Sequence, residues 1–138
     1  MKFLLLGSGA REHSMAKRLK EEGQEVYSYQ IRPNIGLLNL VNKSWLEKNY
    51  DLNRIIKIST QNSIDIIVPC NEQAIYAGVK DSSTINGIKC YAPLSLFCLL
   101  ETDRFFAKQL VMDFDQQLLI PFKVINSYTC LKNFISQY

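Results

Sequence analysis

Short blocks of apolar and polar residues follow one another along the chain and predict strands and helices in turn. Phe3–Leu6 is an apolar run that ends at glycine, which is typical of a buried strand. Residues 11–22 then take helical spacing and stop before Gly23, a natural C-terminal cap. Residues 25–31 alternate and are rich in aromatic and β-branched types, so they predict a second strand. The inward face of the helix is expected to carry Met15, Ala16 and Leu19.

The middle of the chain continues this alternation after a loop-forming stretch, RPNIG, at 32–36. Residues 37–50 predict an irregular connection with a helical turn around Trp45. The segments that follow are a helix over 51–62 capped by Asp51, a buried strand over 64–69, a helix over 71–83 capped by Asn71, and a strand over 88–92. Strands that alternate with helices indicate an α/β fold, a doubly wound parallel sheet covered on both faces.

The end of the chain has a different pattern, which we interpret as the beginning of a second unit. A short helix is expected from Pro93 to Leu100 and another from Glu101 to about Phe114. Residues 122–125, FKVI, resemble a strand. Ser127 is expected to cap a last helix that reaches Tyr138; its apolar side chains, Leu131, Phe134 and Ile135, need a partner surface and could support self-association. The expected domains are therefore 1–100 and 101–138.

Composition narrows the class of protein. The 138 residues, 47% apolar and 21% charged, suit a globular protein with a core. A net charge of +3 from scattered basic residues would suit an anionic ligand but does not indicate nucleic acid. No apolar run approaches the roughly 18 residues of a membrane span, and no signal peptide is recognisable.

Metal chemistry finds little support in the sequence. The four cysteines form no C-x-x-C pair and the single histidine lies far from them, so a zinc site is not expected. Cysteines in apolar surroundings suit the reduced thiols of a cytoplasmic protein.

The segment GSGAREH, between the first strand and its helix, is the best candidate for chemistry. Glycines at such a junction let the backbone approach an anion, and the first-turn amides of the helix point at it. Arg11 would complete a phosphate pocket, whereas Glu12 suits the helix dipole and His13 could be a hydrogen-bonded side chain that covers the sheet edge. The alternative is that Gly7 and Gly9 serve only a tight turn.

A nicotinamide-dependent enzyme is the less favoured interpretation of the same loop. The dinucleotide pattern G-x-G-x-x-G fails at Glu12, and the second strand ends in Ile31-Arg32 without the acid that would bind a ribose hydroxyl. The phosphate loop that ends in Gly-Lys-Ser/Thr is also absent.

The loop resembles the amino-terminal motif of phosphoribosylamine–glycine ligases, purine-biosynthesis enzymes of the ATP-grasp superfamily. The family motif G-S-G-G-R-E-H is matched with one change, Ala10 for glycine. Its P-G-N-x-G loop is matched by 33–36, with the glycine after proline missing. In D-x-x-x-x-G-P-E-x-x-x-x-x-G, Asp65, Glu72 and Gly78 keep register, and Cys70-Asn71 replaces Gly-Pro.

A fourth motif, P-x-x-x-x-x-x-L-E-G-S-K-x-F-A-K, is matched from Pro93 to Lys108. Here Thr102-Asp103-Arg104 replaces Gly-Ser-Lys, and Ile120-Pro121 stands where the family has I-P before the first ATP-grasp strand. The resemblance implies a Rossmann-like pre-ATP-grasp domain over 1–100 and the first elements of an ATP-grasp domain over 101–138. It also implies a ligase that joins glycine to 5-phosphoribosylamine with ATP and magnesium, through a glycyl phosphate.

Site residues follow from the same resemblance. The phosphate of the sugar-amine is expected near Gly7, Ser8, Gly9, Ala10, Arg11, Glu12, His13, Asn34, Gly36 and Glu72. Arg104 and Lys108 are expected to lead into the ATP region.

The residues that carry out catalysis in this family come after the point where this sequence stops. No catalytic or metal-binding residue is therefore predicted, ATP and magnesium are expected only for the full-length parent, and none is expected on this chain alone. We expect an inactive fragment, either an expressed piece or a truncated gene product. The departures at 70–71 and 102–104 leave open a stand-alone, non-catalytic module that binds a phosphorylated metabolite.

Overall fold

The computed structural model describes residues 1–137, and the chain divides into two units, Met1–Cys98 and Leu99 onward. The boundary between the units lies inside helix α6 (Ser95–Thr102).

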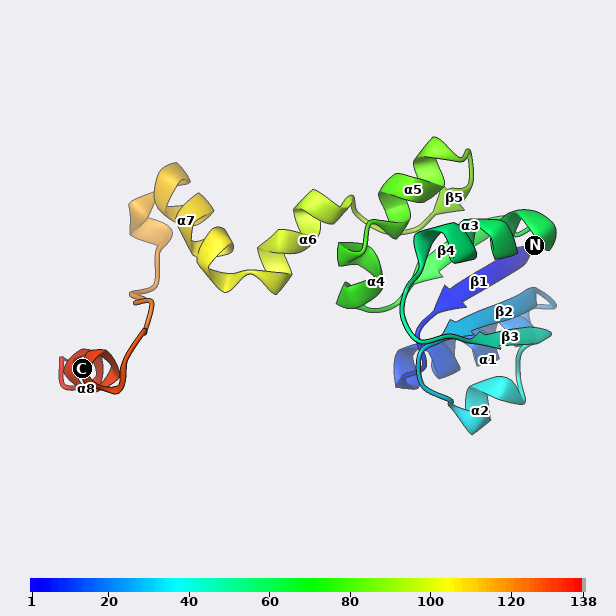
Figure 1. Ribbon diagram of the computed structural model, residues 1–138, viewed down its shortest axis with the longest axis horizontal. Helices are drawn as coiled ribbons and strands as arrows, with labels where there is room; N and C mark the ends of the chain where they lie inside the picture. Colours follow the sequence, from blue (N-terminus) through cyan, green and yellow to red (C-terminus); the bar gives the residue numbers. More distant parts are fainter. Residues whose placement is uncertain (138) are drawn as a thin grey trace. The chain divides into compact units, whose positions relative to one another are not determined.

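The first unit is built on a five-stranded parallel sheet, which confirms the predicted α/β class (Figure 1). The strand order is β3-β2-β1-β4-β5, so the direction in which the chain adds strands reverses between β1 and β4. In open α/β sheets ligands bind beside the carboxyl ends of the strands at such a reversal. The strands are β1 (Lys2–Leu6), β2 (Glu25–Gln30), β3 (Lys43–Leu46), β4 (Ile66–Pro69) and β5 (Lys89–Cys90).

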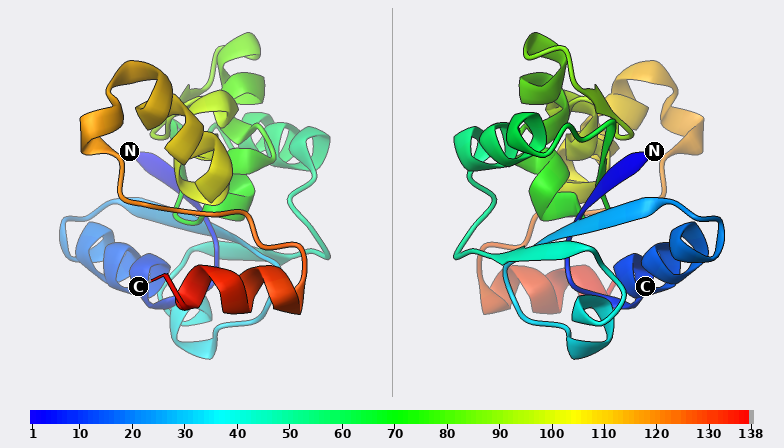
Figure 2. Two further views of the ribbon diagram at one scale, coloured as in Figure 1. Left: turned by 90° about the vertical axis from the view of Figure 1, so that its left-hand side faces the viewer. Right: turned by 90° about the vertical axis from the view of Figure 1, so that its right-hand side faces the viewer.

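Helices cover both faces of this sheet, as expected for a doubly wound fold (Figure 2). Helices α1 (Ala10–Glu21) and α2 (Ile35–Leu38) lie on one face. The other face carries α3 (Leu52–Gln61), α4 (Glu72–Tyr76) and α5 (Val79–Ile85).

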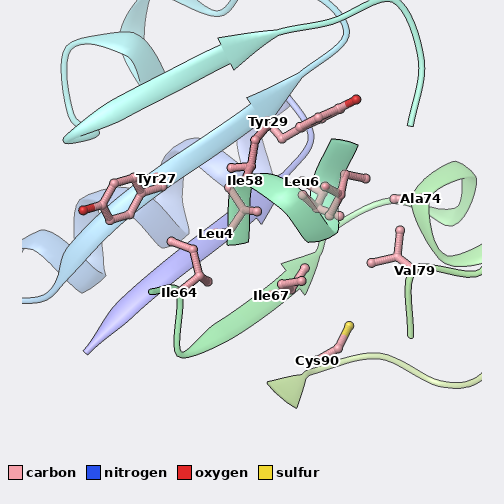
Figure 3. Close-up of a cluster of buried hydrophobic side chains, with 11 residues drawn as sticks. Leu4, Leu6, Tyr27, Tyr29, Ile58, Ile64, Ile67, Ala74, Val79 and Cys90 are labelled. Atoms are coloured by element: carbon pink, nitrogen blue, oxygen red, sulfur yellow. The ribbon is translucent and has the colours of Figure 1, made fainter. Parts of the chain in front are cut away.

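Successive side chains of β1 point to opposite faces and hold the two layers together. Leu4 and Leu6 join a cluster with residues of α3, α4 and α5 (Figure 3), whereas Leu5 packs with Ala16 of α1 and Leu37 of α2. These side chains are fully buried. Met15, which was expected to face inward beside Ala16, is 37% exposed, because α1 turns Ala16 and Glu12 toward the sheet instead.

The prediction for residues 37–50 is wrong around Trp45. Lys43–Leu46 forms the edge strand β3, which pairs with β2 in parallel register. Its position is fixed by tertiary contacts, since the Trp45 ring stacks on Tyr27 at 6.2 Å and the Ser28 hydroxyl donates to the Ser44 hydroxyl at 2.7 Å. The predicted loop 32–36 also ends early, because α2 begins at Ile35.

Residues 71–83 form two helices instead of the single helix predicted. The break lies at Gly78, whose φ of +88° is a left-handed conformation that glycine adopts readily. Asn71 caps the first of the two, α4, as expected: its side chain accepts from the Ala74 amide. The strand expected over 88–92 is shorter, Lys89–Cys90.

The second unit contains α7 (Arg104–Phe114), a 3-10 turn (Gln116–Leu118) and α8 (Tyr128–Ile135). Residues 122–125 form no strand, so that prediction is wrong. Ser127 caps α8 by accepting from the Cys130 amide, as predicted, but the helix ends at Ile135, and Tyr138 lies outside the described residues. Within 1–137, no helix is long and apolar enough to cross a membrane.

Candidate functional site

A pocket of about 470 Å³ opens at the carboxyl edge of the sheet, where the strand order reverses. Three segments that come directly after strands in the chain line it: the glycine loop after β1, the residues after β2, and the start of α4 after β4. A fourth contribution comes from the connection between β3 and α3. The lining residues are Ser8, Gly9, Ala10, Arg11, Glu12, Ile31, Arg32, Tyr50, Asn71, Glu72 and Gln73.

The glycine loop is fastened from both sides and leaves part of the α1 N-terminus open to the pocket. The Gly7 amide donates to the Tyr29 carbonyl at 3.0 Å, and the buried Glu12 carboxylate accepts from the Gly9 amide at 2.8 Å. Glu12 thus neutralises one first-turn donor itself. The amides of Ala10, Arg11 and Glu12 begin the helix and have no intrahelical acceptor, so they are left for an anion.

Two arginines bring positive charge to this pocket. The Arg11 guanidinium lies 3.6 Å from the Glu72 carboxylate, and both side chains are largely exposed, at 68% and 40%. An exposed ion pair of this kind is worth about 0–1 kcal/mol, so a phosphate can compete with Glu72 for Arg11. Arg32 follows β2 and has no hydrogen bond or ion pair with any other residue of 1–137.

Three of the predicted site residues do not line the pocket but support the glycine loop and α1 through contacts with α2. They are His13, Asn34 and Gly36. The Asn34 amide group donates to the Ser8 carbonyl at 2.9 Å and its oxygen accepts from the Leu37 amide, which caps α2. His13 packs closely against Gly36, where an added Cβ would lie 3.1 Å from the imidazole Nε2. These contacts join α1 to α2 under the pocket.

The other predicted positions are divided between the pocket and the second unit. Gly7 is buried beneath the pocket, against Glu12 and Asn71. Arg104 and Lys108 belong to α7 of the second unit and are not among the lining residues. The predicted residues that do share the lining are Ser8, Gly9, Ala10, Arg11, Glu12 and Glu72.

Sequence reasoning did not select Arg32, Tyr50, Asn71 or Gln73 as site residues. Arg32 and Asn71 carried a usable signal, since each follows a strand and strand ends meet at one edge of a parallel sheet. Tyr50 carried none, because it follows β3, which the pattern did not reveal.

Cys70 lies beside the pocket and is chemically quiet. Burial, aided by the nearby Glu12 charge and opposed by Arg11, raises the pKa of its thiol to about 12 from an ordinary 9.0. At pH 8 the thiolate is then about a thousandfold scarcer, an effect that the greater nucleophilicity of a more basic thiolate offsets only in part.

We therefore expect iodoacetamide at pH 8 to alkylate Cys70 at least about 30-fold more slowly in the folded chain than in the urea-unfolded chain. Mass spectrometry of the peptide that contains Cys70 measures the two rates. Equal rates would contradict the partly buried, carboxylate-flanked environment described for this thiol.

Comparison with known proteins now places the chain in a family. Residues 1–101 match the family described as phosphoribosylglycinamide synthetase, N domain. The chain belongs to the phosphoribosylglycinamide synthetase family. A phosphoribosylamine–glycine ligase of Methanobrevibacter smithii is 30% identical over 138 residues, which are 100% of this chain and 31% of that protein. The ligase of Methanosphaera stadtmanae is 32% identical over 115 residues, 83% of this chain and 26% of that protein.

Solved structures show the same fold. Phosphoribosylglycinamide synthetase from Anaerococcus prevotii matches with a TM-score of 0.65 and 14% identity over 99% of this chain and 34% of its own. N5-carboxyaminoimidazole synthetase from Staphylococcus aureus, complexed with ADP, matches with a TM-score of 0.72 and 15% identity over 99% of this chain and 36% of its own. The expected α/β fold class, a doubly wound parallel sheet, is confirmed.

The chain is shorter than the relatives that it matches. It spans roughly a quarter to a third of the length of the two ligases from Methanobrevibacter smithii and Methanosphaera stadtmanae. In the part that the structure describes, no three His, Cys, Asp or Glu side chains gather to hold a metal ion. The lining of the pocket consists largely of backbone amides, two arginines and other polar side chains.

Proposed function

We propose that residues 1–98 form the substrate-binding unit of a phosphoribosylamine–glycine ligase and that the pocket binds the phosphorylated sugar-amine. The observation that carries this proposal is that the open amides of α1 lie in one pocket with Arg11 and Arg32, at the reversal of the strand order. Amides at a helix N-terminus and guanidinium groups are the usual partners of a phosphate.

The volume and polarity of the pocket support a small polar ligand. About 470 Å³ lies at the lower end of the range for small-molecule sites. Glu72 would lie beside the ligand and is the one acidic lining residue, apart from the buried Glu12, that could attract a sugar amine.

Titration of ribose 5-phosphate into the 138-residue chain by calorimetry, at low salt, tests this proposal. We expect Arg11→Ala and Arg32→Ala each to weaken binding about tenfold, because each removes a charge-assisted hydrogen bond worth about 1.5–3 kcal/mol. Arg18→Ala is the matched control: it removes an arginine from the same helix as Arg11, but one that pairs with Glu21 and Glu22 away from the pocket. It should change the affinity by less than twofold.

Two results would overturn the assignment of the pocket. One is no binding of ribose 5-phosphate to the unsubstituted chain. The other is an equal loss for Arg18→Ala and Arg11→Ala, which would indicate attraction by net charge in place of a defined site.

ATP and magnesium enter the proposal only through the full-length parent. Arg104 and Lys108 lie four residues apart in α7, a spacing that places both cations on one helix face and fits nucleotide phosphates. The described residues offer no carboxylate set for magnesium. Glycine and ATP are therefore proposed as partners of the parent, and this chain alone is proposed to lack ligase activity.

Two of the residues that depart from the family motifs have local structural roles. Asn71 caps α4 and Asp103 caps α7, the latter by accepting from the Phe106 amide at 2.9 Å. Nothing at these positions favours a stand-alone binding module over a ligase unit.

A further inference from the structure

Tyr50 lines the pocket, and its hydroxyl contacts Asn71, another lining residue. Tyr29 holds the segment around Tyr50. Tyr29 is fully buried in β2 (Figure 3), and its hydroxyl donates to the Asn49 carbonyl at 2.7 Å while accepting from the Asp51 amide at 3.4 Å. The two neighbours of Tyr50 are thus fastened to one buried side chain. The Tyr29 and Tyr50 rings also stack, with centroids 6.0 Å apart. The Tyr50 ring is therefore fixed before any ligand binds.

Asn71 determines which way the Tyr50 hydroxyl points. The Asn71 side-chain nitrogen lies 2.7 Å from the Tyr50 oxygen and 3.3 Å from the Leu6 carbonyl, and its oxygen accepts from the Ala74 amide at 2.9 Å. A carbonyl on one side and a backbone amide on the other fix the orientation of the amide group. Asn71 must therefore donate to Tyr50, and the phenol oxygen is the acceptor.

The phenol hydrogen is consequently unused. Tyr50 can donate one hydrogen bond, and no acceptor for it is found among the residues that the structure describes. Burial and the nearby Glu12 charge raise the pKa of Tyr50, against the lowering effect of the Asn71 bond, so the hydroxyl keeps its proton at neutral pH. A neutral donor with a fixed ring faces the pocket.

We propose that the Tyr50 hydroxyl donates a hydrogen bond to an oxygen of the bound sugar phosphate, and that Asn71 aims this donor. This inference rests on the proposed function of the pocket. It gives Tyr50 and Asn71, which lie outside the glycine loop, a part in recognising the sugar phosphate. Asn71 stands where the motif that this chain resembles has proline, and a chain with proline at this position could not make the contact, because proline has no side-chain donor.

Calorimetric titration of ribose 5-phosphate into Tyr50→Phe tests the donor. The substitution keeps the ring and removes only the hydroxyl, so we expect binding about tenfold weaker. Tyr76→Phe, on the exposed face of α4, is the matched control and should bind within twofold of the unsubstituted chain. A parallel titration with inorganic phosphate locates the bond: a shared loss assigns it to the phosphate, and a loss confined to ribose 5-phosphate assigns it to the sugar.

Asn71→Asp tests the aiming. An aspartate keeps an oxygen to cap α4 but accepts from Tyr50 where asparagine donates, so it takes up the phenol hydrogen. In the Asn71→Asp background, Tyr50→Phe should then change the affinity by less than twofold, although Asn71→Asp itself weakens binding. The fluorescence of Trp45, the single tryptophan, checks that each variant is folded.

The outcomes separate the two proposals. If the unsubstituted chain binds ribose 5-phosphate and Tyr50→Phe binds equally well, the role of Tyr50 is overturned and the function of the pocket stands. If Tyr50→Phe costs tenfold in both backgrounds, Asn71 does not aim the donor. If the unsubstituted chain fails to bind, both proposals fall.

Discussion

Replacing Gly7 with alanine should lower the free energy of unfolding of the first unit by about 4 kcal/mol. Gly7 has a φ of +138°, where a side chain is strained by about 1–2 kcal/mol. An added Cβ would also meet the Glu12 carboxylate, whose Cδ would lie 2.6 Å away. Glu12 is 3% exposed and cannot move aside without giving up its bond to the Gly9 amide, which costs about a further 1.5–3 kcal/mol.

Urea unfolding followed by Trp45 fluorescence measures this loss, because the single tryptophan packs against the core of the first unit. Gly23→Ala is the matched control. Gly23 also has a positive φ, +73°, but nothing lies within 4 Å of an added Cβ, so only backbone strain of about 1 kcal/mol is expected. Equal losses for the two variants would show that Glu12 does not brace the loop.

Asn34→Ala should destabilise the first unit by about 2–3 kcal/mol, because one side chain serves two backbone partners. It loses the cap on α2, worth about 1 kcal/mol, and the bond to the Ser8 carbonyl, worth about the same or more in this half-buried setting. The loop should also become looser, so ribose 5-phosphate should bind more weakly although Asn34 does not line the pocket.

Asp51→Ala is the matched control for Asn34→Ala, because Asp51 caps a helix as Asn34 does but does not also hold the glycine loop. Asp51 is exposed and caps α3 by accepting from the Arg54 amide, so its loss costs the cap alone, about 1 kcal/mol. Asn34→Asp is the complementary variant, since it keeps the cap and removes the donor to Ser8. A loss for Asn34→Ala no larger than that for Asp51→Ala would contradict the bracing of the loop.

Patterns within single segments were enough to predict most of the first unit. Buried runs such as Phe3–Leu6 and capped amphipathic segments such as 51–62 form the expected strand and helix, because local sequence and tertiary setting agree there. The edge strand β3 was missed, since KSWL has no strong alternation and becomes a strand only through Tyr27, Ser28 and the register of β2. Residues 122–125 have the opposite problem: the pattern fits a strand, but no neighbouring strand pairs with it in the described chain.

The sequence was enough to predict those pocket residues that directly follow a recognised strand. The glycine loop and Glu72 follow strands that the pattern identified, and the structure brings them into one pocket. Asn34 was expected near the ligand, which stays a prediction; the structure adds that its amide group donates to the Ser8 carbonyl, a contact that depends on where α2 packs. Tyr50 was out of reach because its position depends on the unrecognised β3 and on a hydrogen bond from Tyr29 in the core.

The pairing of β1 with both β2 and β4 has a consequence for how the pocket comes into existence during folding. Phe3 of β1 pairs with Val26 in β2, which follows after one helix, and with Ile66 in β4, which lies much further along the chain. Bringing β4 to β1 therefore closes a longer loop and costs more chain entropy than bringing β2 to β1. Asn71 and Glu72 reach their places only when β4 inserts beside β1. A bound metabolite would therefore stabilise only chains that have completed this late step, and by mass action it would favour their accumulation.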